Sequence, residues 1–228
     1  MKISPRSIKG IGVLGSVLLA LVVYPWLTNA SIGAQDKAQG SAAPPSAPLE
    51  IKVPPGTLDA VTAILTRRSI RDYTPRPVPE DLVKLLLNAG MSAPSAVDER
   101  STEFVVITDR KILDAIHEFN TKRPQLKKAG VAILVCGNQQ REKSKGQGFW
   151  VLDGAVAAEN ILVAAHAVGL GAVWTAIYPF PDRMAKVQKM LNMPQTVIPL
   201  CIIPIGYPAE RKITGSRFDP SRAHKNRW

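Results

Sequence analysis

Three arginines and a serine gather in the run Arg67–Arg71 (RRSIR). They lie within one turn of the end of a predicted helix. A guanidinium group is a planar fork of donors that stays charged at physiological pH and matches phosphate oxygens two at a time. The spacing therefore favours an anion site. A solvated basic helix end, where arginine suits the helix dipole, is the alternative that the cluster alone leaves open.

A second candidate segment, Ala93–Asp98 (APSAVD), lies between a predicted helix and a predicted strand. Small residues let backbone amides approach a flat ligand closely. Ser95 can donate a hydrogen bond, and Asp98 can accept one from a ring N–H. A Pro-Ser turn followed by polar surface is the competing interpretation of this segment.

A third segment, Gly169–Ile177, begins with Gly-Leu-Gly. A dinucleotide fingerprint must follow a strand and open a helix. This segment closes a predicted helix and opens a strand, so the sequence argues against a Rossmann site. None of the three histidines has a partner at metal-ligand spacing, and no nucleophile–base arrangement is recognisable, so we expect no metal site and no protein nucleophile.

Apolar periodicity and turn residues predict the elements that position these segments. Thr57 is expected to cap the first helix. The predicted helices are 58–65, 80–89, 111–119, 152–168 and 181–191, and the predicted strands are 104–108, 131–136, 172–177 and 198–205. This order predicts an α/β or α+β sandwich with a small central sheet flanked by helices.

The predicted helix at 152–168 is Ala-rich and apolar on nearly every side. A helix without a polar face is buried all round. In a domain of this size, that composition predicts a second subunit on its outer side. Cys136 and Cys201, the only cysteines, fall in predicted apolar strands and are expected to be free thiols in the core. A disulfide between them is possible only if those two strands are neighbours.

The first 34 residues have the layout of an export signal, with a basic start, the uncharged stretch 11–27 and small residues after it. The stretch of 17 residues is at the lower limit for a membrane span, so an uncleaved N-terminal anchor is the alternative. Both interpretations predict export, to the periplasm or to a membrane with the domain outside the cytoplasm. Residues 35–55 read as a flexible Ala/Pro/Ser-rich linker, and 56–228 as one domain.

The net charge is +11, and it remains +8 without residues 1–34, which hold three basic and no acidic residues. A basic surface suits nucleic acid, anionic lipid or phosphorylated small molecules. Apart from the arginine cluster and the C-terminal tail, the basic residues are dispersed, and no aromatic-studded strand accompanies them. We therefore expect no nucleic-acid binding.

Taken in order, RRSxR after an opening helix, APSA before a strand, the GLGAVW turn and the ending GYPAE…NRW resemble the FMN-dependent nitroreductase family, in particular its short single-domain members. The resemblance covers residues 57–228. It implies an α+β fold and an obligate homodimer with two FMN sites at the subunit interface. It also implies that hydride passes from NAD(P)H to the flavin N5 and then, in a ping-pong mechanism, to a nitroaromatic or quinone-like acceptor.

The resemblance also implies roles for individual residues, all of them in cofactor binding. The phosphate and ribityl chain would be held by Arg67, Arg68 and Ser69, with a further phosphate contact from Arg217. Arg71 would lie at the N1/C2 carbonyl edge of the flavin. The loop along the ring edge would be Pro94, Ser95, Ala96 and Asp98, and the strand near N5 would be Trp174, Thr175 and Ala176.

The sequence departs from the family pattern beside the ring-edge loop. Asp98 stands where Asn is usual and Arg100 where Gln is common, while Ser101-Thr102 replace a usual Pro-Trp. Asp98 adds a negative charge near the ring, and Arg100 is expected to offset it.

The sequence leaves two other classes of function open. The same scaffold could serve reductive dehalogenation or cleavage of the flavin itself, or the domain could be a non-enzymatic flavin carrier or basic binding module. Export would separate the domain from cytoplasmic NAD(P)H, so a different electron donor is also open.

Overall fold

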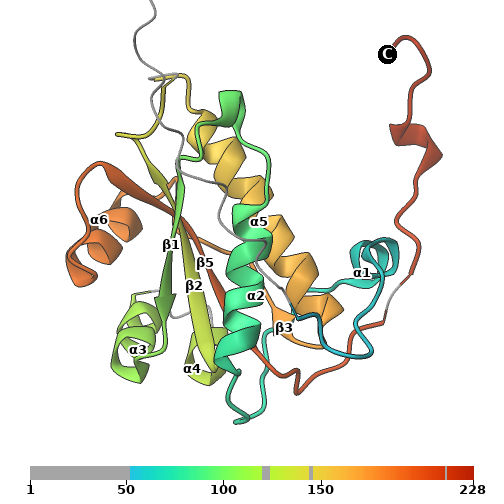
Figure 1. Ribbon diagram of the computed structural model, residues 1–228, viewed down its shortest axis with the longest axis horizontal. Helices are drawn as coiled ribbons and strands as arrows, with labels where there is room; N and C mark the ends of the chain where they lie inside the picture. The colour runs from blue at the N-terminus through green and yellow to red at the C-terminus, as the bar shows by residue number, and fades with distance from the viewer. Residues whose placement is uncertain (1–51, 120–123, 144–145, 214) are drawn as a thin grey trace, which may run out of the picture. The chain divides into compact units, whose positions relative to one another are not determined.

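The computed structural model describes residues 52–119, 124–143, 146–213 and 215–228 (Figure 1). The predicted export segment, and the linker as far as residue 51, lie outside these ranges. Within them, no helix is both long enough and apolar enough to cross a bilayer.

Helices and strands follow one another in a mixed order along the chain. The helices are α1 (Ala60–Thr66), α2 (Glu80–Met91), α3 (Arg110–Glu118), α4 (Gln125–Lys128), α5 (Phe149–Ala167) and α6 (Pro181–Met190), with 3-10 turns η1 (Ala96–Asp98) and η2 (Pro220–Arg222). The strands are β1 (Thr102–Ile107), β2 (Val131–Asn138), β3 (Gly171–Ala172), β4 (Thr175–Ala176) and β5 (Val197–Gly206).

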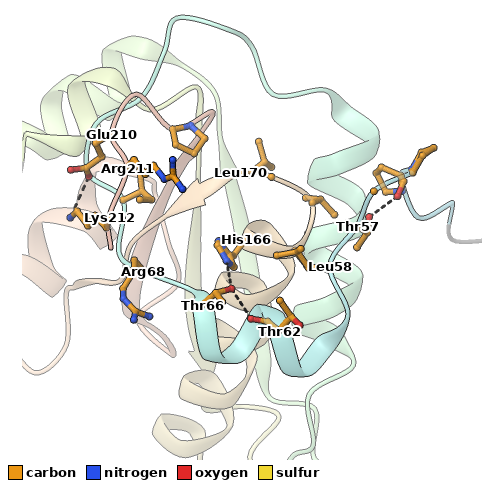
Figure 2. A pocket seen from close by; sticks show the side chains of 18 residues that line it. Thr57, Leu58, Thr62, Thr66, Arg68, His166, Leu170, Glu210, Arg211 and Lys212 are labelled. Atoms are coloured by element: carbon orange, nitrogen blue, oxygen red, sulfur yellow. Dashed lines mark hydrogen bonds and ion pairs between the residues drawn. The ribbon is translucent and has the colours of Figure 1, made fainter. Parts of the chain in front are cut away.

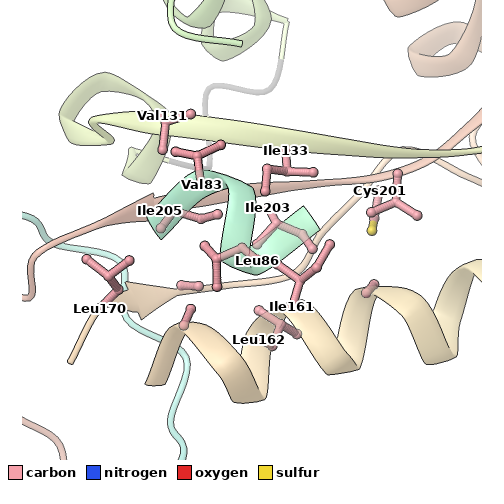
Figure 3. Close-up of a cluster of buried hydrophobic side chains, with 14 of the residues drawn as sticks. Val83, Leu86, Val131, Ile133, Ile161, Leu162, Leu170, Cys201, Ile203 and Ile205 are labelled. Atoms are coloured by element: carbon pink, nitrogen blue, oxygen red, sulfur yellow. The ribbon is translucent and has the colours of Figure 1, made fainter. Parts of the chain in front are cut away.

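The strands form one antiparallel sheet in the order β1-β2-β5-β3, with β4 also paired to β5. Because successive side chains of a strand point to opposite faces, β2 and β5 supply two separate cores. One core packs α2 and α5 against Ile133 and Ile203 (Figure 3). The other packs α3, α4 and α6 against Leu134 and Ile202. The predicted α+β sandwich is confirmed.

The two cysteines are free and buried, as the sequence predicts. Their strands are neighbours, and Val135 pairs with Cys201 in the register. However, Cys201 belongs to the core beneath α5, and Cys136 belongs to the core on the opposite face of the sheet. The sheet therefore separates the two thiols, and burial raises the pKa of both, that of Cys136 to about 12.

Two local predictions need correction, and one helix was not predicted. Asp59, not Thr57, caps α1, because its carboxylate accepts the Thr62 N–H while the Thr57 hydroxyl donates to the Pro54 carbonyl. The predicted strand at 172–177 is two short strands, since their shared register places Pro204, which has no N–H, opposite Val173. The four-residue helix α4 is too short to leave a periodic pattern, and the sequence analysis missed it.

Candidate functional site

The arginine-rich segment 67–71 leaves α1 and runs alongside β3. Ser69 forms an isolated parallel bridge with Ala172, and the Ile70 N–H donates to the Ala172 carbonyl at 3.0 Å. Ile70 is buried over Gly171, where a Cβ atom would stand only 2.6 Å from the Ile70 Cγ2. Glycine at the second position of the Gly-x-Gly pair thus allows this segment to approach the sheet.

The extended course of the segment divides its side chains between two faces. Side chains alternate in an extended backbone, so Arg67, Ser69 and Arg71 share one face. Ile70 is buried on the opposite face, and Arg68 lines a pocket together with it. The structure therefore places Arg67, Ser69 and Arg71, which were predicted to contact the phosphate, the ribityl chain and the ring, on one face, and it places Arg68 on the other.

The guanidinium groups of the first two arginines are held by different partners. Arg67 Nε lies 3.1 Å from Glu159 Oε1 on α5. Arg68 donates to the carbonyls of Leu65, Arg67 and Gly215. These contacts fix the two side chains in divergent directions, and they relieve the repulsion between neighbouring cations.

The C-terminal tail braces the segment from its other side. The Glu210 carboxylate accepts the Arg71 N–H, and Lys212 Nζ donates to the Ser69 carbonyl at 2.7 Å. The Arg71 N–H, followed by Lys212, lowers the pKa of Glu210. Further along the tail, Arg217 lines a hollow of about 590 Å³ with the last turn of α1. The tail thus brings Arg217 to the end of the helix from which Arg67 emerges.

The predicted strand at 174–176 follows β3 directly. The side chain of Thr175 is fully buried, and its hydroxyl accepts a hydrogen bond from Gln125 Nε2 at 3.0 Å. Trp174 packs against the core beneath α5, and the Ala176 carbonyl accepts from Arg183. Thr175 therefore faces the core, so only its backbone is free to contribute to a site.

The predicted ring-edge loop forms η1 and the residues around it. Asp153 on α5 accepts the Ala96 N–H at 3.0 Å, and the Ser95 hydroxyl accepts the Arg100 N–H at 3.0 Å. Val97, Asp98 and Arg100 have φ values of 43°, 52° and 51°, in the left-handed region that is sparsely used by non-glycine residues. Strained backbone of this kind is concentrated at functional sites.

Asp98 and Arg100 form a bidentate ion pair, with Nε at 2.8 Å from Oδ1 and Nη2 at 3.1 Å from Oδ2. The Arg100 guanidinium lowers the pKa of the Asp98 carboxyl, so this carboxylate is ionised at neutral pH. The pair agrees with the expectation that Arg100 offsets the charge that Asp98 adds to this loop.

The loop also walls a pocket of about 480 Å³ with the end of α2, the start of β1 and α5. Pro94, Ser95 and Asp153 are among its lining residues. Asp153 is only 6% exposed, and its Oδ2 has no hydrogen-bond partner. Asp153 was not predicted as a site residue, although a carboxylate in the otherwise apolar helix α5 was an available signal.

The two halves of the predicted site lie on different parts of α5. The loop contacts the helix at Asp153, and Arg67, which directly follows α1, contacts it at Glu159. Thr66 of α1 contacts His166, and Leu58, which precedes α1, contacts Ala167. Asp153 and Glu159 are about 9 Å apart along the axis at 1.5 Å per residue, and Asp153 and His166 are about 20 Å apart. The chain therefore places the segment 67–71, which lies beside β3 and the residues 174–176 that follow it, further along α5 than residues 94–98.

Comparison with known proteins identifies the class. The model of the Nitroreductase family matches residues 64–130 and 120–207. A relative from Methanothermobacter thermautotrophicus, named "Putative NADH dehydrogenase/NAD(P)H nitroreductase", is 47% identical over 171 residues, which are 75% of this chain and 88% of the relative. The chain belongs to the nitroreductase family.

Solved structures agree with this assignment. A protein of the same name from Bacteroides thetaiotaomicron is 43% identical, with a TM-score of 0.70 over 74% of this chain and 98% of that one. An "FMN-dependent Nitroreductase" from Clostridium difficile is 28% identical, with a TM-score of 0.67 over 74% of this chain and 99% of that one. The fold is the nitroreductase fold.

Proposed function

We propose that the protein is an FMN-dependent oxidoreductase that transfers two electrons, as hydride, from NAD(P)H to an electron-poor acceptor of the nitroaromatic or quinone type. Membership of the nitroreductase family supports the reaction class, and the names of the relatives include both NAD(P)H and FMN. The observation that carries the proposal is the row Arg67, Ser69 and Arg71 on one face of a segment fixed between β3 and the tail.

The side chains of this row fit the polar parts of FMN. The Arg67 guanidinium and the Ser69 hydroxyl can hold a phosphate and the adjoining chain by hydrogen bonds, of which that of Arg67 is charge-assisted, and Arg71 on the same face is left for the ring. Arg217, at the end of α1, would add a cation on the phosphate side. Arg67 would exchange its exposed partner Glu159 for the phosphate, and an exposed ion pair of this kind is weak.

FMN, when bound, supplies the redox chemistry, with hydride accepted and released at its N5. The residues of the chain bind and orient it. Arg71 would place a cation at the N1/C2 edge and favour negative charge there by preorganised electrostatics. The backbone of 174–176 would lie near N5, while Asp98 would accept the ring N–H.

A second subunit would complete each site. Because the loop at 94–98 and the row at 67–71 lie on different parts of α5, we propose that each flavin is held by the row of one subunit and the loop of its partner. Exposed apolar side chains support such an interface, including Leu152 on α5, which is 60% exposed, and Leu65 on α1, which is 67% exposed.

Complementation between two defective variants tests this arrangement. Arg67→Ala removes a phosphate contact, and Ser95→Trp blocks the ring-edge loop. Each homodimer should lose FMN, whereas a purified heterodimer of the two variants should bind one FMN, because one of its sites is intact. A heterodimer without FMN, alongside a fully loaded wild type, would place the loop and the row of each site in the same subunit.

The place of action is a separate proposal. The export-signal layout of residues 1–34 supports a periplasmic or membrane-anchored protein. Because export would separate the domain from cytoplasmic NAD(P)H, a different electron donor is the alternative. Fractionation with mass spectrometry of the mature N-terminus tests export, and anaerobic assays with NADH, NADPH and dithionite compare the donors. Flavin that only dithionite reduces would favour a carrier or a different donor over the proposed reductase.

A further inference from the structure

A pocket of about 580 Å³ lies between α1, the C-terminal end of α5 and the tail (Figure 2). Its volume is in the range of small-molecule sites. Leu58, Ile70 and Leu170 give it apolar walls, while His166 and Arg211 give it polar ones. In Figure 2, the His166 ring and the Arg211 side chain lie on different sides of this space.

The protonation of His166 follows from its hydrogen bonds. The Thr66 hydroxyl donates its single hydrogen to the Thr62 carbonyl at 2.6 Å. His166 Nε2 lies 2.9 Å from the same Thr66 oxygen, so Nε2 must be the donor in that contact. The ring is therefore the Nε2–H tautomer. Its Nδ1 is left as an acceptor that can take up a proton.

The charged groups around this histidine are mostly cationic. The tail supplies Arg211, Lys212 and the single acid Glu210, and Arg68 comes from the end of α1. Lys212 and Glu210 lie 3.4 Å apart and offset each other. Arg68 is bound to carbonyls. Arg211 is an exposed guanidinium on the wall of the pocket.

The remaining charges near His166 do not change this balance. Asp59 caps α1 and is occupied by the Thr62 N–H. Glu159, two turns earlier on α5, is paired with Arg67. Burial, followed by the charges of Arg67 and Arg68, lowers the pKa of His166. The histidine is therefore neutral at pH 7 in the empty pocket.

We propose that this pocket binds a small organic anion, a carboxylate or a phosphate monoester with an apolar body, through Arg211 and His166. The anionic group pairs with the Arg211 guanidinium, and the proton that His166 takes up adds a second positive charge across the pocket that attracts the same group. The apolar body lies against Leu58 and Leu170. Since binding takes up one proton, the affinity rises as the pH falls toward the pKa of the bound histidine.

The pocket adjoins the proposed flavin site, with which it shares Thr66 of the hollow that Arg217 lines, but it is a different space. It lies on the face of the 67–71 segment that carries Arg68 and Ile70, opposite the face of Arg67, Ser69 and Arg71. It is also separate from the pocket beside the loop at 94–98, since the two share no lining residue. A ligand here would touch the back of the segment that is proposed to hold FMN.

The test uses the full-length chain saturated with FMN, and the probes are benzoate, phenyl phosphate and uncharged benzamide. The His166 ring is followed by NMR and assigned with His166→Gln. At least one anion should bind with a rise of about one unit in the pKa of His166, whereas benzamide should bind at least about tenfold more weakly. The comparison of benzoate with phenyl phosphate identifies the preferred anionic group.

Two charge variants complete the test. Arg211→Gln should weaken binding of the preferred anion about tenfold, the loss expected for a charge-assisted hydrogen bond. Lys189→Gln, which removes an exposed cation on α6, should bind like the wild type. The proposal is overturned if neither anion shifts the His166 resonances, if Arg211→Gln binds normally, or if FMN and the anion compete. Failure of the chain to bind FMN would refute the proposed function alone, because the same titration can be run without flavin.

Discussion

Gly171→Ala tests whether the close approach of the 67–71 segment to the sheet positions the proposed flavin site. The added Cβ would lie 2.6 Å from the Ile70 Cγ2 and 2.8 Å from the Ile70 Cβ. Carbon atoms in contact are ordinarily about 3.5–4.0 Å apart, so Ile70 must move outward by about 1 Å. Ser69 and Arg71, its chain neighbours, must move with it.

The magnitude follows from the tightness of this contact. The Ile70 N–H is bonded to the Ala172 carbonyl, so the shift strains the backbone as well as the side chain. Overpacking of a tight core costs about 1–3 kcal/mol, and we expect the free energy of unfolding to fall by that amount. We also expect FMN affinity to fall about tenfold, which corresponds to about 1.4 kcal/mol, since the binding row is displaced.

Urea denaturation measures the first quantity, and quenching of FMN fluorescence on binding to the apoprotein measures the second. Gly215→Ala is the matched control, because its added Cβ would meet nothing within 4 Å. The control should keep wild-type stability within about 0.5 kcal/mol. If Gly171→Ala is as stable as the control and binds FMN equally well, the close packing does not position the row.

Three further predictions concern charge and burial. The pKa of the Asp98 carboxyl should lie below the ordinary value of about 3.9 and return toward it in Arg100→Gln, so in the wild type the ion pair is lost only as the pH falls through the lowered pKa. Carboxyl NMR titration of the wild type and the variant measures the two pKa values, and identical values would contradict the pairing. Cys136 and Cys201 should resist a thiol reagent at pH 8 in the folded protein and react after unfolding, because burial raises the pKa of both thiols; rapid reaction of the native protein would argue against their burial. Arg71→Ala should lower the potential of bound FMN and slow turnover while FMN is still bound, and an unchanged potential in a redox titration would remove the proposed role of Arg71.

The sequence predicted the order of the main elements because their patterns are local. The apolar run of β2 and the Ala-rich pattern of α5 each specify an element without reference to the rest of the chain. The start of α1 was wrong by two residues, since Thr57 and Asp59 both suit a cap and only the structure shows that Thr57 is occupied by Pro54. The break between β3 and β4 depends on Pro204, which lies on another strand.

The candidate site was predictable only in part. The order of the motifs identified the segments of the site. That Arg68 points away from the face of Arg67 and Ser69 follows from the extended backbone beside β3, which only the structure shows. The supporting carboxylates Asp153 and Glu210 act through backbone N–H groups far away in sequence. Such contacts have no fixed spacing, so a single sequence could not reveal them.

The most direct test of the proposed activity is an anaerobic titration of the purified full-length protein, loaded with FMN, with NADH and with NADPH. The account predicts a bound flavin whose absorption band is bleached by one equivalent of at least one of these donors per FMN, and restored by a quinone or nitroaromatic acceptor. A chain that neither carries nor binds FMN, or a bound flavin that neither donor bleaches, would contradict it.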